Sequence, residues 1–149
     1  CDYDTFIRST GHITQNDMSA VKQAFTCALF NVIFNNRDDH AKNFSYLLNE
    51  HREWKLAPAY DLTYNEGPSG YHQMSVMGET QLIPRQAILA LAKAANISAP
   101  EVEQMIERFA TVATSFSALC NEFFNQEIRP TTIKHIQQTL NRNLAAIRS

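Results

Sequence analysis

Residues 16–61 read NDMSAVKQAFTCALFNVIFNNRDDHAKNFSYLLNEHREWKLAPAYD, and this stretch decides the fold. Asn16 and Asp17 are residue types that cap helices, and the apolar positions after them recur at the helical period as far as about Asn35. The sequence therefore predicts a helix apolar enough to be central to the core. Its apolar positions are Met18, Val21, Phe25, Ala28, Leu29, Val32 and Ile33.

A polar segment, residues 36–43, follows this helix and reads NRDDHAKN. It cannot continue an apolar face, so we expect a loop. Asp38 and Asn43 stand five positions apart. This is the spacing of the protein-kinase catalytic loop, where Asp positions the acceptor hydroxyl and Asn holds Mg²⁺.

The next part of the chain is predicted to be a β-hairpin. Residues 44–48 and 53–57 are short, contain aromatic side chains and flank a turn at 49–52. Pro58 stops the second strand, and a new loop begins at Tyr60-Asp61. A hairpin returns the chain to its starting end, so Asn43 and Asp61 could face one ion.

Most of the remaining chain is predicted to be helical. Residues 1–13 are expected to be a connector or the tail of an earlier element, and residues 62–83 are expected to be irregular. Helices are expected from Pro84 to about Asn96 and, after a capping box at residues 98–101, to about Phe116 or Leu119. A last helix starts at Thr131 or Thr132, with the stripe Ile133, Ile136, Leu140, Leu144 and Ile147. The fold class is therefore mainly α, with one hairpin, in a single domain over residues 1–149.

Composition narrows the functional classes. The chain has 149 residues, 44% hydrophobic and 19% charged, and a net charge of −2, which argues against a surface built chiefly for nucleic acid. No apolar run approaches membrane-spanning length, so we expect no membrane association. The first residues show neither the basic region nor the apolar region of a signal peptide, so we expect a cytoplasmic protein. Cys1, Cys27 and Cys120 are far apart and show no zinc-ligand spacing, so structural zinc is not expected.

The polar segment supplies the groups that phosphoryl transfer needs. Asp38 would orient the acceptor hydroxyl or take its proton, and Asn43 and Asp61 would hold Mg²⁺, which prefers oxygen ligands. Lys42 could reach a phosphate. Asp39 competes with Asp38 for the catalytic role but lies only four positions from Asn43. His40 could brace the loop or touch the nucleotide.

The segments Asp38–Ser45, Leu56–Leu62 and Met74–Gly78 together resemble the C-terminal domain of HipA-family toxin kinases. The resemblance implies the helical C-lobe of a serine/threonine protein kinase that uses ATP and Mg²⁺. It implies Asp38 as the catalytic residue and Asn43 and Asp61 as metal ligands. The residues that would line the nucleotide are His40, Ala41, Lys42, Asn43 and Tyr60.

The resemblance also implies partners. Family members with known targets phosphorylate aminoacyl-tRNA synthetases, which slows translation and growth, so the expected substrate is a protein. They are restrained by a small helix-turn-helix antitoxin of the HipB type, which implies contact with DNA only indirectly, through that antitoxin.

A kinase also needs a phosphate-covering loop and a nucleotide lysine from its N-lobe. The four glycines form no G-x-G-x-x-G or Walker A pattern, and nothing resembles V-A-I-K. Since the chain opens Cys-Asp-Tyr, without Met, we expect it to be part of a longer protein whose N-lobe lies elsewhere, and to be nearly inactive alone.

Two alternatives remain open. One is a metal-dependent phosphohydrolase using Asp38, Asp39, His40 and Asp61, although only His51 and His72 could add ligands. The other is a non-catalytic helical module that docks an antitoxin or DNA through the stripe from Ile133 to Ile147.

Overall fold

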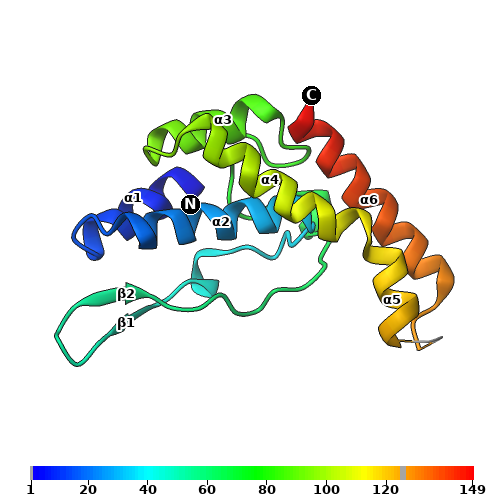
Figure 1. Ribbon diagram of the computed structural model, residues 1–149, viewed down its shortest axis with the longest axis horizontal. Helices are drawn as coiled ribbons and strands as arrows, with labels where there is room; N and C mark the ends of the chain where they lie inside the picture. The colour runs from blue at the N-terminus through cyan, green and yellow to red at the C-terminus, as the bar shows by residue number, and fades with distance from the viewer. Residues whose placement is uncertain (1, 125–126) are drawn as a thin grey trace.

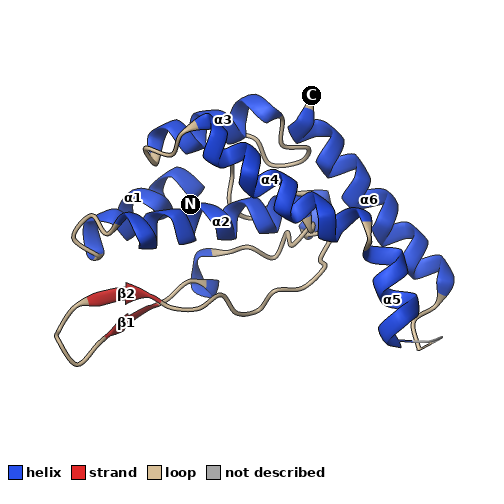
Figure 2. Cartoon of the chain, in the orientation of Figure 1, coloured by secondary structure: helices blue, strands red, loops and turns tan. Residues whose placement is uncertain are grey.

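The computed structural model describes residues 2–124 and 127–149, which form α-helices and one two-stranded antiparallel hairpin (Figure 1). In Figure 2 the hairpin and the loops beside it lie on one side of the molecule, and the long helices lie on the other. The mainly helical fold class expected from the sequence is confirmed. The elements are α1 Tyr3–Ile13, α2 Met18–Ile33, β1 Tyr46–Leu48, β2 Trp54–Leu56, α3 Arg85–Ala94, α4 Ala99–Thr114, α5 Phe116–Phe124 and α6 Pro130–Arg148, with 3-10 turns at Ala41–Asn43 and Pro68–Gly70.

Helix α2 is central, as predicted. The Asp17 carboxylate caps it by accepting a hydrogen bond from the Ser19 amide at 2.9 Å. Phe25, Leu29 and Ile33 are completely buried. In Figure 1 α3 and α4 lie on one side of α2, and the hairpin with its flanking loops lies on the other. The loops are therefore attached to a helix that is central to the core.

The expectation of a connector over residues 1–13 is wrong for residues 3–13, which form α1; residue 1 lies outside the described residues. The helix buries Tyr3, Phe6, Ile7 and Thr10, a helical spacing that forms one face against α2. Gly11 lies in its last turn, where an added Cβ would already contact Val21 Cγ2 at 3.5 Å. Close packing of α1 on α2 therefore outweighs the low helix propensity of glycine.

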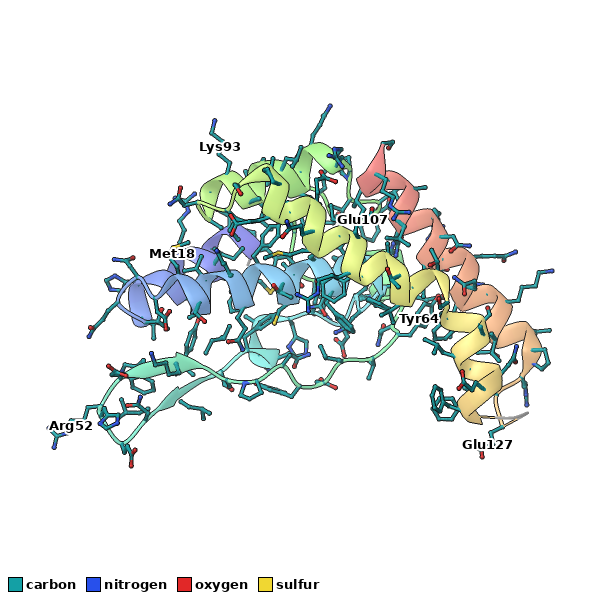
Figure 3. All side chains as sticks on the ribbon, in the orientation of Figure 1. Met18, Arg52, Tyr64, Lys93, Glu107 and Glu127 are labelled. Atoms are coloured by element: carbon teal, nitrogen blue, oxygen red, sulfur yellow. The ribbon has the colours of Figure 1, made fainter. Side chains whose placement is uncertain are left out.

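The hairpin is confirmed, with Tyr46 opposite Leu56 and Leu48 opposite Trp54. Figure 3 places Arg52 at its outer tip, far from the helical body. The irregular segment before α3 is also confirmed: within residues 62–83 the structure has only a 3-10 turn and isolated bridges.

The C-terminal helices differ from expectation at one point. The capping box is confirmed, since Ser98 and Glu101 cap α4 reciprocally, but the helix ends at Thr114 and α5 begins separately at Phe116. The stripe on α6 is core: Ile133, Leu140, Leu144 and Ile147 are buried and Ile136 is partly buried. That stripe is therefore not a free surface for the interaction module considered above.

Candidate functional site

The candidate site is built from two segments that run side by side below α2. After α2 ends, the Arg37 amide donates to the Asn65 carbonyl at 3.1 Å, and the Asn65 amide donates to the Asn35 carbonyl at 3.0 Å. Farther along, the Tyr60 hydroxyl donates to the Lys42 carbonyl at 3.0 Å. The segment that precedes the hairpin and the segment that follows it are therefore joined by hydrogen bonds at both ends, and Figure 1 shows both segments on the hairpin side of α2.

Asp39 is the buried carboxylate of the loop. Its side chain is fully inaccessible and accepts hydrogen bonds from the Tyr3 hydroxyl at 2.7 Å, His72 Nδ1 at 2.8 Å and the Gln73 amide at 2.9 Å. Burial alone would raise the pKa of Asp39, but the hydrogen bonds from His72, Tyr3 and Gln73 outweigh it and hold the pKa below its usual value. Asp39 is therefore an ionised anchor.

The network of Asp39 reaches the second segment through Tyr3 and two further side chains, Asn31 and Asn36. The Tyr3 oxygen accepts a hydrogen bond from Asn31 Nδ2 at 2.9 Å. Asn36 Nδ2 donates to Asn31 Oδ1 at 3.0 Å and to the Asp61 carbonyl at 3.4 Å. Burial and the neighbouring Asp39 charge raise the pKa of Tyr3 well above its usual value, so its hydroxyl stays protonated and available as a donor.

Asp38 has the opposite environment. Its side chain is 41% exposed, and its Oδ1 accepts a hydrogen bond from Gln73 Nε2 at 2.6 Å and lies 3.7 Å from His40 Nε2. Its Oδ2 has no hydrogen bond with the residues that the structure describes. The Asp38 carbonyl accepts from Asn43 Nδ2 at 2.9 Å, which leaves the Asn43 side-chain oxygen for another partner. Of the two adjacent carboxylates, Asp38 is the one that could meet a substrate.

Asp61 lies in the left-handed region of the backbone, with φ 55°, which is uncommon for a residue with a side chain. Its carbonyl is held by Asn36, while its exposed carboxylate makes no hydrogen bond or ion pair with any described residue. Ala41, Lys42 and Tyr60 are also exposed, and His40 is half-buried.

The donor set fits Mg²⁺. Asn43 and Asp61 offer an amide oxygen and a carboxylate, and Mg²⁺ is usually held by one or two protein ligands together with phosphate oxygens and water. Among residues 2–124 and 127–149, no three His, Cys, Asp or Glu side chains gather as a metal-binding cluster. An arrangement with one carboxylate and one amide does not require such a cluster.

The phosphohydrolase alternative fits the structure less well. It needs Asp39 as a ligand, but that carboxylate is enclosed by Tyr3, His72 and Gln73. His72 is itself buried against Asp39, and His51 lies beside Glu50 in the hairpin turn. These residues do not form a second metal-binding group near Asp38.

Arg37 supports the loop from inside. Only 7% exposed, it donates to the carbonyls of Gly70 and Gln81, the latter at 3.0 Å, and so holds the irregular segment before α3. Burial, followed by the nearby Arg142, lowers the pKa of Arg37. This cation therefore has a structural role.

Sequence reasoning missed Tyr3, Asn31 and Gln73 as parts of the site, and it considered His72 only as a metal ligand. Tyr3 and Gln73 contact residues more than thirty positions away, so no local pattern reports them. The helical spacing of Tyr3 and Phe6 was the one available signal, because it would have placed α1 in the core.

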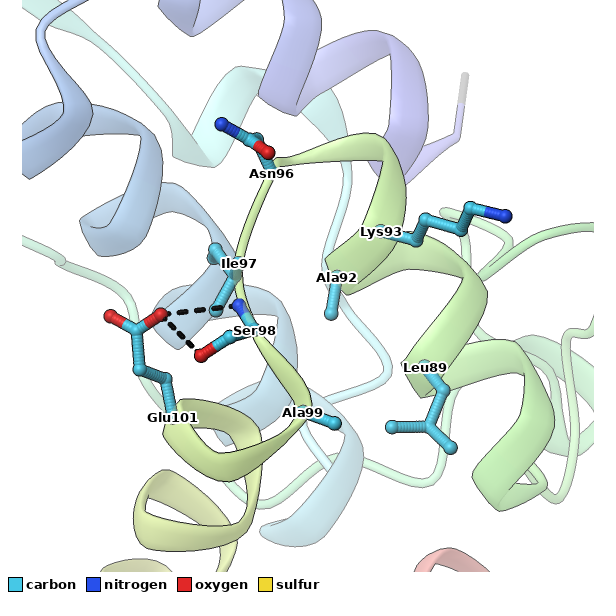
Figure 4. A pocket seen from close by; sticks show the side chains of 8 residues that line it. All are labelled: Leu89, Ala92, Lys93, Asn96, Ile97, Ser98, Ala99 and Glu101. Atoms are coloured by element: carbon cyan, nitrogen blue, oxygen red, sulfur yellow. Dashed lines mark hydrogen bonds between the residues drawn. The ribbon is translucent and has the colours of Figure 1, made fainter.

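A separate hollow of about 410 Å³ lies between α3 and α4 (Figure 4). The carboxylate on its rim is satisfied internally: Glu101 accepts from the Ser98 amide and hydroxyl at 3.1 and 2.7 Å and pairs with Lys22 at 2.6 Å. None of its lining residues belongs to the two segments of the candidate site.

Comparison with known proteins agrees with the resemblance seen in the sequence. The family model described as the HipA-like C-terminal domain matches residues 1–116, which include α1 to α4 and both segments of the candidate site. A comparison with curated proteins gives no match. Within the part of the chain that the structure describes, no helix is both long and apolar enough to cross a bilayer. The chain belongs to the HipA-like C-terminal domain family.

Proposed function

We propose that this chain is the catalytic lobe of a Mg²⁺-dependent serine/threonine protein kinase. The observation that carries the proposal is the contrast between two adjacent carboxylates. Asp39 is buried and fully hydrogen-bonded, whereas Asp38 is exposed with Oδ2 unengaged by any described residue. A kinase catalytic loop needs a carboxylate that faces the acceptor hydroxyl, and of these two carboxylates only Asp38 is exposed.

The residues take the roles that their environments permit. Asp38 Oδ2 accepts the proton of a serine or threonine hydroxyl as its oxygen bonds to the γ-phosphorus and the bond from that phosphorus to the β–γ bridging oxygen breaks. Asn43 and Asp61 hold Mg²⁺, which when bound neutralises phosphate charge. His40, Ala41, Lys42 and Tyr60 would line the nucleotide, and Lys42, whose side chain is exposed, would supply a positive charge for its phosphates.

The proposal includes an N-lobe outside residues 1–149. The chain has no G-x-G-x-x-G loop and no V-A-I-K strand, so we expect these parts to come from elsewhere in the protein. The isolated chain should therefore transfer little phosphate.

Membership of the HipA-like family supports a wider role in a bacterial toxin–antitoxin system. The acceptor would be a protein such as an aminoacyl-tRNA synthetase. A HipB-like helix-turn-helix antitoxin would restrain the kinase and would provide its only link to DNA.

Nucleotide binding by the full-length gene product tests the metal site. Titration calorimetry with a non-hydrolysable ATP analogue, with and without Mg²⁺, should show Mg²⁺-dependent binding that N43A and D61N weaken about tenfold or more. N121A removes an exposed amide from α5 and should bind as the wild type does. Unchanged Mg²⁺-dependent affinity in both N43A and D61N would overturn the proposed metal site.

A further inference from the structure

Gln73 bridges the two adjacent carboxylates of the loop. Its backbone amide donates to Asp39 Oδ1 at 2.9 Å, and its side-chain Nε2 donates to Asp38 Oδ1 at 2.6 Å. An ionised carboxylate only accepts hydrogen bonds, so the amide nitrogen of Gln73 must be the group that faces Asp38. His72, next to Gln73, donates to the other oxygen of Asp39.

We propose that Gln73 is a positioning residue for Asp38, an inference that rests on the proposed kinase function. A half-exposed carboxylate can rotate about its last side-chain bond. Gln73 Nε2 and His40 Nε2 lie 2.6 and 3.7 Å from Asp38 Oδ1. Because both side chains hold Oδ1, they also fix the direction of Oδ2, the oxygen assigned to the acceptor hydroxyl.

The backbone around Gln73 is held firmly enough for this role. His72 and Met74 on either side are 5% and 1% exposed, and the amides of Gln73 and Met74 both point to Asp39 Oδ1. The His72 and Met74 side chains are buried whereas that of Gln73 is exposed, so the Gln73 side chain lies on the outer side of the segment, where it reaches Asp38. Asp39 therefore acts on Asp38 through Gln73.

If the Gln73 side chain had only a structural role, its replacement would lower the stability of the fold. The side chain is exposed, while the Gln73 amide that anchors the segment belongs to the backbone. Replacement of the side chain should leave the fold intact. Q73A removes the donor, and Q73E keeps the shape but places a carboxylate against Asp38, so a positioning role predicts that Q73E is the more damaging change.

The test uses the full-length gene product and measures transfer of labelled phosphate from [γ-³²P]ATP to protein and to water, with Mg²⁺ present. Q73A should lower kcat roughly tenfold and Q73E roughly a hundredfold, because misorientation of a catalytic group has effects of this order. KM for ATP should stay within about twofold and the melting temperature should be unchanged, since Gln73 is not assigned to the nucleotide. Q86E places the same charge on the exposed face of α3 and should behave as wild type.

The double variant D38N/Q73A completes the test. If Gln73 acts through Asp38, adding Q73A to D38N should cause no further loss of turnover. Wild-type kcat in Q73A and Q73E, with D38N inactive, would overturn the role of Gln73 and leave the proposed function standing. Wild-type turnover in D38N would overturn the proposed function itself.

Discussion

The hydroxyl of Tyr3 donates a hydrogen bond to Asp39 Oδ2 at 2.7 Å, which ties the first helix of the chain to the candidate catalytic loop. The same hydroxyl oxygen accepts from Asn31 on α2. One buried side chain therefore joins α1, α2 and the loop, and the position of Asp38 depends on residues at the start of the chain.

Removal of this hydroxyl should destabilise the protein. Y3F leaves Asp39 and Asn31 each short of a partner, and an unsatisfied buried polar group costs about 1–3 kcal/mol. Urea unfolding should show this loss in the free energy of unfolding. Y71F is the control, since Tyr71 is exposed and its hydroxyl has no hydrogen bond with described residues; equal stability of the two variants would contradict the network.

Asp39 should also make stability depend on pH. Because its pKa is lowered in the folded protein, its stabilisation is present above the unfolded-state pKa of about 4 and is lost as the pH falls through the folded-state pKa. The difference in unfolding free energy between wild type and D39N should therefore be greatest near neutral pH and shrink in acid. A difference that does not change with pH would show that the charge of Asp39 contributes nothing.

Gly67 should tolerate alanine much less well than Gly78. Both glycines have positive φ, 72° and 91°, which costs alanine about 1–2 kcal/mol. A Cβ at Gly67 would also lie 2.2 Å from the Tyr71 carbonyl oxygen and 2.7 Å from Arg37 Cβ, whereas at Gly78 the space is open. Thermal and urea unfolding should show a clearly larger loss for G67A, upward of about 3 kcal/mol once the overpacking is added; equal losses would contradict the close approach to Arg37.

The start of α4 gives a prediction independent of the candidate site. S98A removes the hydroxyl that completes the capping box with Glu101, and loss of such a cap costs about 1 kcal/mol. S9A, on the exposed face of α1, is the matched control and should not destabilise. Equal unfolding free energies for S98A and wild type would show that the cap contributes nothing to stability.

Local signals predicted much of the fold. Asp17 and Ser98 are caps whose partners lie two or three residues away, and both were found from the sequence. The hairpin strands are set by a turn of only a few residues. By contrast, the break between α4 and α5 at Ser115 was missed, because apolar residues continue through it.

The candidate site could be predicted only in part, because some of its contacts join segments that are far apart in the sequence. Asp38, Asn43 and Asp61 stand out by type and spacing, and the hairpin explains how their segments meet. The division of roles between Asp38 and Asp39 depends on Tyr3, His72 and Gln73, whose contacts form only when distant segments pack together. The choice of Asp38 over Asp39 therefore gains a physical reason only in the folded chain.

The most direct test of the central claim is the rate of phosphoryl transfer by the D38N variant of the full-length gene product. With [γ-³²P]ATP and Mg²⁺, D38N should lose about 10²–10⁴-fold in kcat, because it removes the group proposed to take the hydroxyl proton. Its melting temperature and its affinity for the Mg²⁺–nucleotide complex should remain those of the wild type. Undiminished transfer by D38N would contradict the account.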